Sequence, residues 1–174
     1  MTGMAATPHL IHLPDLPTNN PYTDTVRFRL LTVEDNDYYR DGDRHEIEGL
    51  ITDGDAELTY RLWMQESPAP LVIIVPGLGG HYANSVPTAL GERLYNAGNS
   101  VAIVSNPFNW EFVKNASSRV VPGYTPRDAH DLYRFVRRML AEIRDDCEDD
   151  TVTETILLGY SLGAIDTLFV AMID

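Results

Sequence analysis

The sequence has little of three things that would indicate particular classes of protein: cysteine, positive charge and long apolar runs. Its single cysteine, Cys147, cannot form a disulfide within the chain, and the carboxylates of residues 145–150 disfavour a reactive thiolate there. Lysine and arginine number 13 against 26 aspartate and glutamate residues, which gives a formal net charge of −13. Because such a chain repels polyanions, nucleic acid and anionic membranes are not expected as main partners.

Signals for export and for membrane insertion are also missing. Residues 1–23 contain neither a basic leader nor the apolar core of a signal peptide, and no stretch approaches the roughly 18 apolar residues of a membrane span. As written, the sequence predicts a cytoplasmic protein, unless a leader once preceded Met1. Its 174 residues, of which 44% are hydrophobic, predict a single soluble globular domain.

The patterns that could bind a metal ion are weak. His9 and His12 have a spacing that could hold a metal on a helix, but the surrounding prolines predict an irregular arm over residues 1–24. The carboxylates of residues 34–37 and 41–43 lack the order of an EF-hand loop and indicate a solvated loop. We therefore expect neither a metal nor a cofactor.

Alternating apolar and polar residues predict two half-buried strands near the start of the chain, at residues 26–30 and 57–63. We expect them to be antiparallel neighbours. A further short strand can be placed at residues 47–51, with His45 in the polar loop before it.

Buried strands then alternate with helices from residue 71 onward. Continuous apolar runs predict the strands, and helical spacing with N-terminal capping residues and a glycine stop predicts the helices. The expected elements are a strand at 71–75, a helix from Asn84 or Ser85 to Gly98, a strand at 100–104, a helix from 125 to about 144, a strand at 154–158 and a helix at 162–173. This order predicts an α/β fold: a three-layer αβα sandwich with a mostly parallel sheet.

The pentapeptide Gly159-Tyr160-Ser161-Leu162-Gly163 joins the last predicted strand to the last predicted helix. In this context it resembles the nucleophile elbow of the α/β-hydrolase family. The resemblance extends over residues 25–174 and implies the N-terminal half of an α/β-hydrolase domain, an incomplete version of the fold. It also implies that Ser161 is the nucleophile of an acyl-transfer reaction.

The same resemblance implies an oxyanion hole. In the family one donor is the amide of the residue after the nucleophile, here Leu162, and the other comes from a glycine-rich turn, here residues 76–80, which places it at Leu78. Pro76 stands where the family often has histidine. The turn does not match the G-x-G-x-x-G pattern and no Walker lysine follows it, so a dinucleotide or phosphate site is not expected.

Candidate substrate-binding residues lie after two of the predicted strands. His81 and Tyr82 follow the glycine turn, where His81 could serve as a substitute base or, alternatively, lie at the rim of the site or bond within its loop. Phe108 and Trp110, in a segment with Phe112, could line an acyl pocket or pack the loop onto the sheet.

The rest of a catalytic triad is missing after the elbow. No histidine follows Ser161, and neither Asp166 nor Asp174 fits the place of the catalytic acid. His130 is expected on the surface of its helix. The sequence thus predicts a truncated serine hydrolase of esterase, lipase or thioesterase type that acts on a small-molecule acyl substrate. The alternative is a non-catalytic binding module with the same fold.

Truncation would have two structural consequences. The strand at residues 154–158 would be an unpaired sheet edge through which the chain could self-associate. The helix at residues 162–173, apolar nearly all round, would be buried within a larger body.

Overall fold

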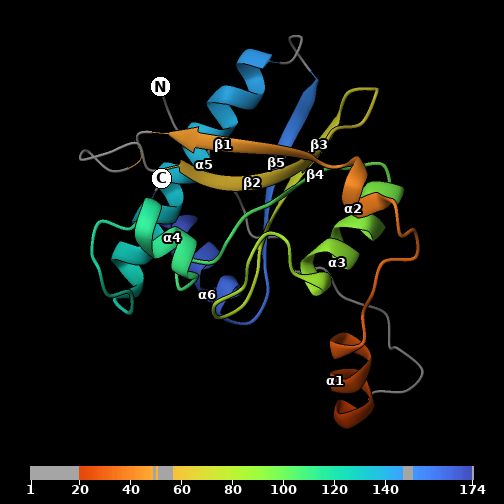
Figure 1. Ribbon diagram of the computed structural model, residues 1–174, viewed down its shortest axis with the longest axis horizontal. Coiled ribbons are helices and arrows are strands. Elements are labelled where there is room, and N and C mark those ends of the chain that lie inside the picture. The colour runs from red at the N-terminus through yellow and green to blue at the C-terminus, as the bar shows by residue number, and fades with distance from the viewer. Residues whose placement is uncertain (1–19, 49, 51–56, 147–150, 174) are drawn as a thin grey trace. The chain divides into compact units, whose positions relative to one another are not determined.

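The computed structural model describes residues 20–48, 50, 57–146 and 151–173, so that the predictions for His9, His12 and Cys147 lie outside the described residues. The chain divides into two units, Met1–Leu30 and Leu31–Asp174. Helix α1 (Pro21–Arg29) belongs to the first unit. All the other described helices and strands belong to the second (Figure 1).

Helix α1 replaces the strand that we predicted at residues 26–30, and it also includes residues 21–24 of the predicted irregular arm. The Asn20 side chain caps it by accepting hydrogen bonds from the amides of Tyr22 (3.0 Å) and Thr23 (3.4 Å), and Pro21 occupies the first turn. These are strong helix-start signals, and they outweigh a five-residue alternation that is too short to define a strand. The predicted pairing with residues 57–63 is therefore wrong.

Five strands form one sheet in the order β1-β2-β4-β3-β5. They are β1 (Asp43–Glu48), β2 (Glu57–Trp63), β3 (Ala69–Val75), β4 (Ser100–Ile103) and β5 (Val152–Gly159). Strand β3 pairs in parallel with β4 and β5, whereas β2 is antiparallel to β1 and β4. The predicted parallel sheet is confirmed in the centre, and β5 lies at an edge of the described sheet as predicted. Self-association through that edge stays a prediction.

The structure corrects the sequence prediction around His45. The short strand predicted at residues 47–51 begins earlier, as β1, and includes His45, which we had placed in a loop. The His45 ring stacks on that of Tyr60 in β2, with 5.1 Å between the ring centroids. The carboxylates that we expected in a loop also fall partly in helix α2 (Tyr38–Asp41) and at the start of β1.

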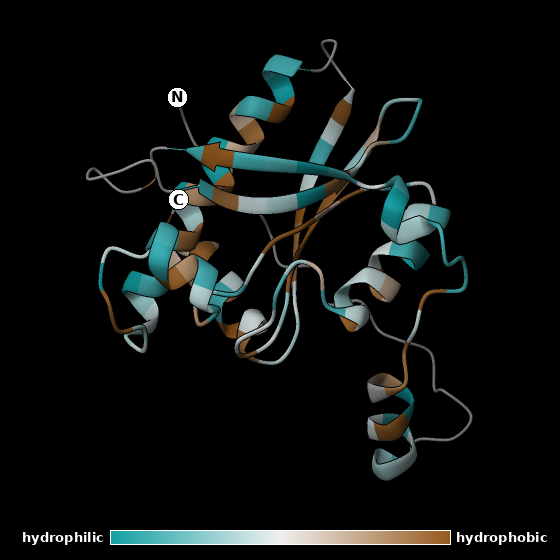
Figure 2. Ribbon diagram, in the orientation of Figure 1, coloured by the Kyte–Doolittle hydropathy of each residue, from teal (hydrophilic) through white to brown (hydrophobic). Residues whose placement is uncertain are grey.

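Helices cover both faces of the sheet. On β3, Leu71 and Ile73 pack into one apolar cluster with α5 (Thr125–Asp146), and Val72 and Ile74 pack into a second cluster with residues of α3 (Ser85–Asn96). Figure 2 shows that the central strands are mainly hydrophobic, whereas β1 is mainly hydrophilic. Because alternate side chains of β3 point to opposite faces, a continuous apolar run is what a strand in the middle layer requires. The predicted three-layer architecture is confirmed.

The remaining helices are α4 (Trp110–Asn115) and α6 (Leu162–Val170). The sequence predicted burial all round for the last helix, but Ile165, Leu168 and Met172 are 46%, 67% and 77% exposed. The opposite side of α6 packs against α5, with Val170 in the core. Among the described helices, none combines the length and the apolar character needed to cross a membrane.

Candidate active site

The site predicted from the sequence lies where the central strands end. Strands β3, β4 and β5 are parallel, so the segments that follow them meet at the carboxyl ends of the strands (Figure 1). In open α/β sheets ligands bind at the carboxyl ends of the strands. The turn at residues 76–80 follows β3, the segment at residues 105–109 follows β4, and Ser161 follows β5.

Ser161 has a strained backbone. Its φ is 54° and its ψ is −126°, and it is the one non-glycine residue with positive φ in the part of the chain that the structure describes. A side chain in this region costs free energy, and such residues gather at functional sites. Ser161 is exposed and sits between the end of β5 and the first turn of α6. This is the strand-turn-helix context that a nucleophile elbow requires.

Three glycines allow the backbone segments around Ser161 to touch. A Cβ on Gly159 would lie 2.2 Å from the carbonyl oxygen of Gly163, and one on Gly163 would lie 2.2 Å from the carbonyl oxygen of Val75. A Cβ on Gly77 would lie 2.9 Å from the Ser161 Cβ and 3.3 Å from its Oγ. Glycine is therefore required at all three positions, and the contact at Gly77 places the turn after β3 directly beside the serine.

Two backbone amides near the serine are free to donate. Leu162 is the first residue of α6, and Leu78 lies at the tip of the turn with 70% of its surface exposed. Within the described residues, neither amide donates a hydrogen bond to the protein. The turn itself is closed by the Gly80 amide, which donates to the Gly77 carbonyl oxygen at 2.8 Å. Unpaired amides of this kind are the donors that an oxyanion needs.

Two asparagines of the segment after β4 hold the turn in place. The Asn106 Nδ2 donates to the Pro76 carbonyl oxygen at 2.9 Å, and the Asn106 amide donates to the Gly80 carbonyl oxygen at 2.9 Å. The Asn109 Nδ2 donates to the Gly79 carbonyl oxygen, also at 2.9 Å. Three carbonyl groups of one short turn therefore point toward the β4 segment, which fixes the direction of the amides between them.

Asp166 of α6 belongs to the same network through a hydrogen bond from Asn106. It is 1% exposed, and its Oδ2 accepts a hydrogen bond from the Asn106 Nδ2 at 3.0 Å, while its Oδ1 has no partner among the described residues. Burial raises the pKa of Asp166 to about 6; the nearby Asp128 also raises this pKa and the bond from Asn106 lowers it. The carboxyl group therefore titrates in the weakly acidic range and bonds to the residue that holds the turn.

His81 is engaged away from the serine. Its Nε2 lies 2.9 Å from the Glu111 Oε2, and its Nδ1 accepts a hydrogen bond from the Ala83 amide at 3.2 Å. The Tyr82 ring packs beside the imidazole, with 4.1 Å between the centroids. Because both ring nitrogens have partners, this conformation leaves neither of them free to take a proton from Ser161. The bond from Ala83 corresponds to the predicted alternative of a bond within the loop, whereas the contact with Glu111 joins the loop to α4.

The three aromatic residues after β4 separate from one another. Phe112 is fully buried in the core, Phe108 is half-buried, and Trp110 is 75% exposed at the start of α4. The Trp110 side chain lines a pocket of about 380 Å³ together with Val113, Lys114, Ser117, Ser118, Arg119 and Val120. Of the two alternatives for this segment, packing onto the sheet therefore applies to Phe112, whereas Trp110 is accessible to a ligand.

Sequence reasoning missed Asn106, Asn109 and Glu111, and it set Asp166 aside. The asparagines had a usable signal, because they follow a buried strand at the edge where the glycine turn and the elbow also lie. We considered only the aromatic residues of that segment. Asp166 had no such signal, since its contact with Asn106 joins positions that are 60 residues apart.

The fold resembles that of solved esterases. One protein, from Bacteroides fragilis and assigned as an acetyl xylan esterase, matches with a TM-score of 0.51 and 10% identity over 94% of this chain and 60% of its own. Esterase Est22 matches with a TM-score of 0.50 and 17% identity over 85% and 43%. Est1E from Butyrivibrio proteoclasticus matches with a TM-score of 0.46 and 20% identity over 75% and 45%.

These similarities are structural ones. Neither the models of protein families nor the curated proteins give a match to this sequence. The chain spans about half the length of the solved structures that it resembles, between 43% and 60% for the three named above. The two matches with TM-scores of 0.51 and 0.50, together with the sheet order and the helices on both faces, show that this chain has an α/β-hydrolase-like fold of the kind found in esterases.

Proposed function

We propose that this chain carries the nucleophile of a serine hydrolase of esterase, lipase or thioesterase type. The observation that supports this best is the backbone of Ser161, which is strained and exposed, at the junction of β5 and α6. In the proposed reaction the Ser161 Oγ attacks the carbonyl carbon of a small acyl substrate and expels the leaving group, and water then releases the acyl group.

The proposed oxyanion hole consists of the Leu78 and Leu162 amides. Support comes from the contact of Gly77 with Ser161 and from the absence of other partners for both amides within the described residues. Fixed donors of this kind stabilise the charge that develops on the carbonyl oxygen during attack. The asparagine contacts keep the turn from rearranging, so little reorganisation is needed at the moment of reaction.

No general base is assigned among the described residues. No histidine follows Ser161, His45 stacks on Tyr60, His81 is bonded to Glu111, and His130 is exposed on α5. A serine that has no base retains only a small part of its rate acceleration. The contacts of His45 and His81 are the observation behind the second candidate, a binding module with the same fold that needs no base.

The substrate-binding role of Phe108, Trp110, His81 and Tyr82 is part of the same proposal. The exposed indole of Trp110 could contact an apolar acyl or leaving group at the rim of the site, whereas the buried Phe112 could not. Partial exposure of His81 and Tyr82, which follow the glycine turn, is compatible with a contact there.

A fluorophosphonate probe tests the proposal, because it reacts only with an activated serine. In the natural protein that contains this chain we expect labelling at Ser161, loss of labelling in Ser161→Ala and loss after heat denaturation. Mass spectrometry of the labelled peptide identifies the residue. A folded natural protein that is not labelled, or is labelled equally well in Ser161→Ala, would support the binding module instead.

A further inference from the structure

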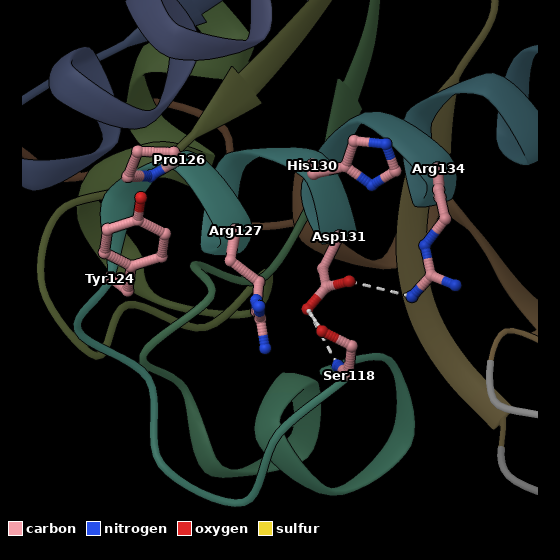
Figure 3. Close-up of a pocket in the computed structure, with 7 residues that line it drawn as sticks. All are labelled: Ser118, Tyr124, Pro126, Arg127, His130, Asp131 and Arg134. Carbon is pink, nitrogen blue, oxygen red and sulfur yellow. Dashed lines mark hydrogen bonds and ion pairs between the residues drawn. The ribbon is translucent and has the colours of Figure 1, made fainter.

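A pocket of about 390 Å³ lies between the start of α5 and the loop at residues 117–124 (Figure 3). It is lined by Ser118, Tyr124, Pro126, Arg127, His130, Asp131 and Arg134. On α5 the residues 127, 130, 131 and 134 recur at the spacing of one helix face. Helix α5 begins at the end of the sheet where α6 also begins, and it later leads into β5 (Figure 1).

Arg127 is the unusual residue of this pocket. It is half-buried, and Figure 3 shows its side chain between Tyr124 and Asp131, yet its guanidinium makes no hydrogen bond or ion pair within the described part of the chain. Burial raises the pKa of the neighbouring Asp128, and the charge of Arg127 opposes this rise only through space. Two more exposed arginines of the same helix are paired: Arg134 bonds to Asp131 at 2.8 Å and Arg138 to Glu142 at 3.1 Å. A partly buried cation that has no protein partner among the described residues is available to pair with a ligand.

The carboxylates beside Arg127 already have partners. Asp131 is 2% exposed and accepts hydrogen bonds from the Ser118 amide (2.7 Å), the Ser118 hydroxyl (2.9 Å) and Arg134. Asp128 is 5% exposed and accepts one from the Gly123 amide at 2.7 Å. These bonds tie both ends of the loop to α5, so the walls of the pocket are fixed before any ligand arrives.

We propose that this pocket binds an oxyanion, the carboxylate or phosphate group of a small organic acid, with Arg127 as its anchor. The planar guanidinium offers paired donors that match such a group. The Tyr124 ring, which is 67% exposed, and Pro126 form an apolar surface for the body of the ligand, and His130 also lines the pocket. Because the net charge of the chain is −13, the positive charge of Arg127 distinguishes this pocket from the predominantly negative protein around it.

Titration with two probes tests this proposal in the intact chain, independently of any hydrolase activity. Inorganic phosphate and benzoate are added separately while amide and arginine side-chain NMR signals are recorded. We expect saturable shifts of Ser118, Gly123, Tyr124 and the Arg127 side chain for at least one probe. Benzoate alone would identify a carboxylate with an apolar body as the ligand, and phosphate alone a phosphate group.

Two variants provide the contrast. Arg127→Gln is expected to weaken binding about tenfold, as the loss of one charge-assisted pair implies. The fold should not change, because the Arg127 side chain makes no hydrogen bond or ion pair among the described residues. Arg138→Gln removes the same charge about three turns further along α5, outside the lining of the pocket, and should leave affinity within about twofold. The proposal is wrong if neither probe saturates by about 10 mM, or if both variants weaken binding equally, which would indicate general charge attraction.

Discussion

Two segments at the same end of the sheet are held in place by different chemistry. The turn at residues 76–80 is fixed by neutral amide donors from Asn106 and Asn109 and by glycines that allow backbone atoms to touch. The loop at residues 117–124 is fixed by the buried carboxylates of Asp128 and Asp131. Gly77 and Gly80 of the turn leave no room for an added Cβ, whereas the loop depends on two charges.

The difference suits what each segment is proposed to do. An oxyanion hole must keep its donors at one distance from the reacting atom, and backbone contact provides that rigidity. An anion pocket instead needs its own carboxylates bonded to other groups, so that Arg127 keeps an uncompensated charge. The two segments should therefore respond differently to added volume, to pH and to the loss of a charge.

The largest effect is expected from adding a methyl group at the elbow. In Gly163→Ala the new Cβ would lie 2.2 Å from the Val75 carbonyl oxygen, so strand and helix must separate, and the free energy of unfolding should fall by about 4 kcal/mol. Urea unfolding measures the change. Gly79→Ala is the matched control: its Cβ would contact nothing within 4 Å, and only its φ of 66° is unfavourable, so about 1 kcal/mol is expected. Equal losses would show that the close approach at the elbow is not what requires glycine.

A smaller effect is expected from the charge of Asp166. Its pKa is raised to about 6 in the folded chain, so the folded state holds the proton more tightly than the unfolded state does. The stability that this group contributes is therefore present below about pH 4 and is lost as the pH rises to about 6, by roughly 2–3 kcal/mol.

Asp166→Asn isolates this contribution. Its free energy of unfolding should be close to that of the unchanged chain near pH 4 and should exceed it by roughly 2–3 kcal/mol at pH 7, because asparagine carries no charge to bury. Unfolding curves of both chains at several pH values give this difference. The contributions of the other carboxyl groups are the same in both chains and cancel when the two free energies are subtracted. A difference that is constant with pH would contradict the raised pKa.

The smallest effect should be confined to the loop. In Asp131→Asn the side chain can keep only some of the three hydrogen bonds that the carboxylate accepts. The free energy of unfolding should fall by about 2 kcal/mol. Hydrogen exchange should show a loss of protection at the Ser118 amide, while the Gly80 amide, bonded within the turn, keeps its protection. Equal loss at both amides would mean that turn and loop are one cooperative unit.

Much of the second unit was predictable from local pattern. The apolar runs predicted β3 and β4, and helical spacing with capping residues predicted α3 and α5, because these segments carry their own period and end signals. The helix at residues 21–29 was also readable from Asn20 and Pro21, but a short alternation was given more weight. That error came from a local signal that we misjudged.

By itself the sequence determined the alternation of strands and helices, the two glycine-rich turns and the place of Ser161 between a strand and a helix. Tertiary structure decided which of these segments meet. The bonds from Asn106 to Pro76 and to Asp166, and the pairing of His81 with Glu111, join residues that no local pattern relates. They arise because parallel strands bring their ends to one edge of the sheet, and buried polar groups must find partners there.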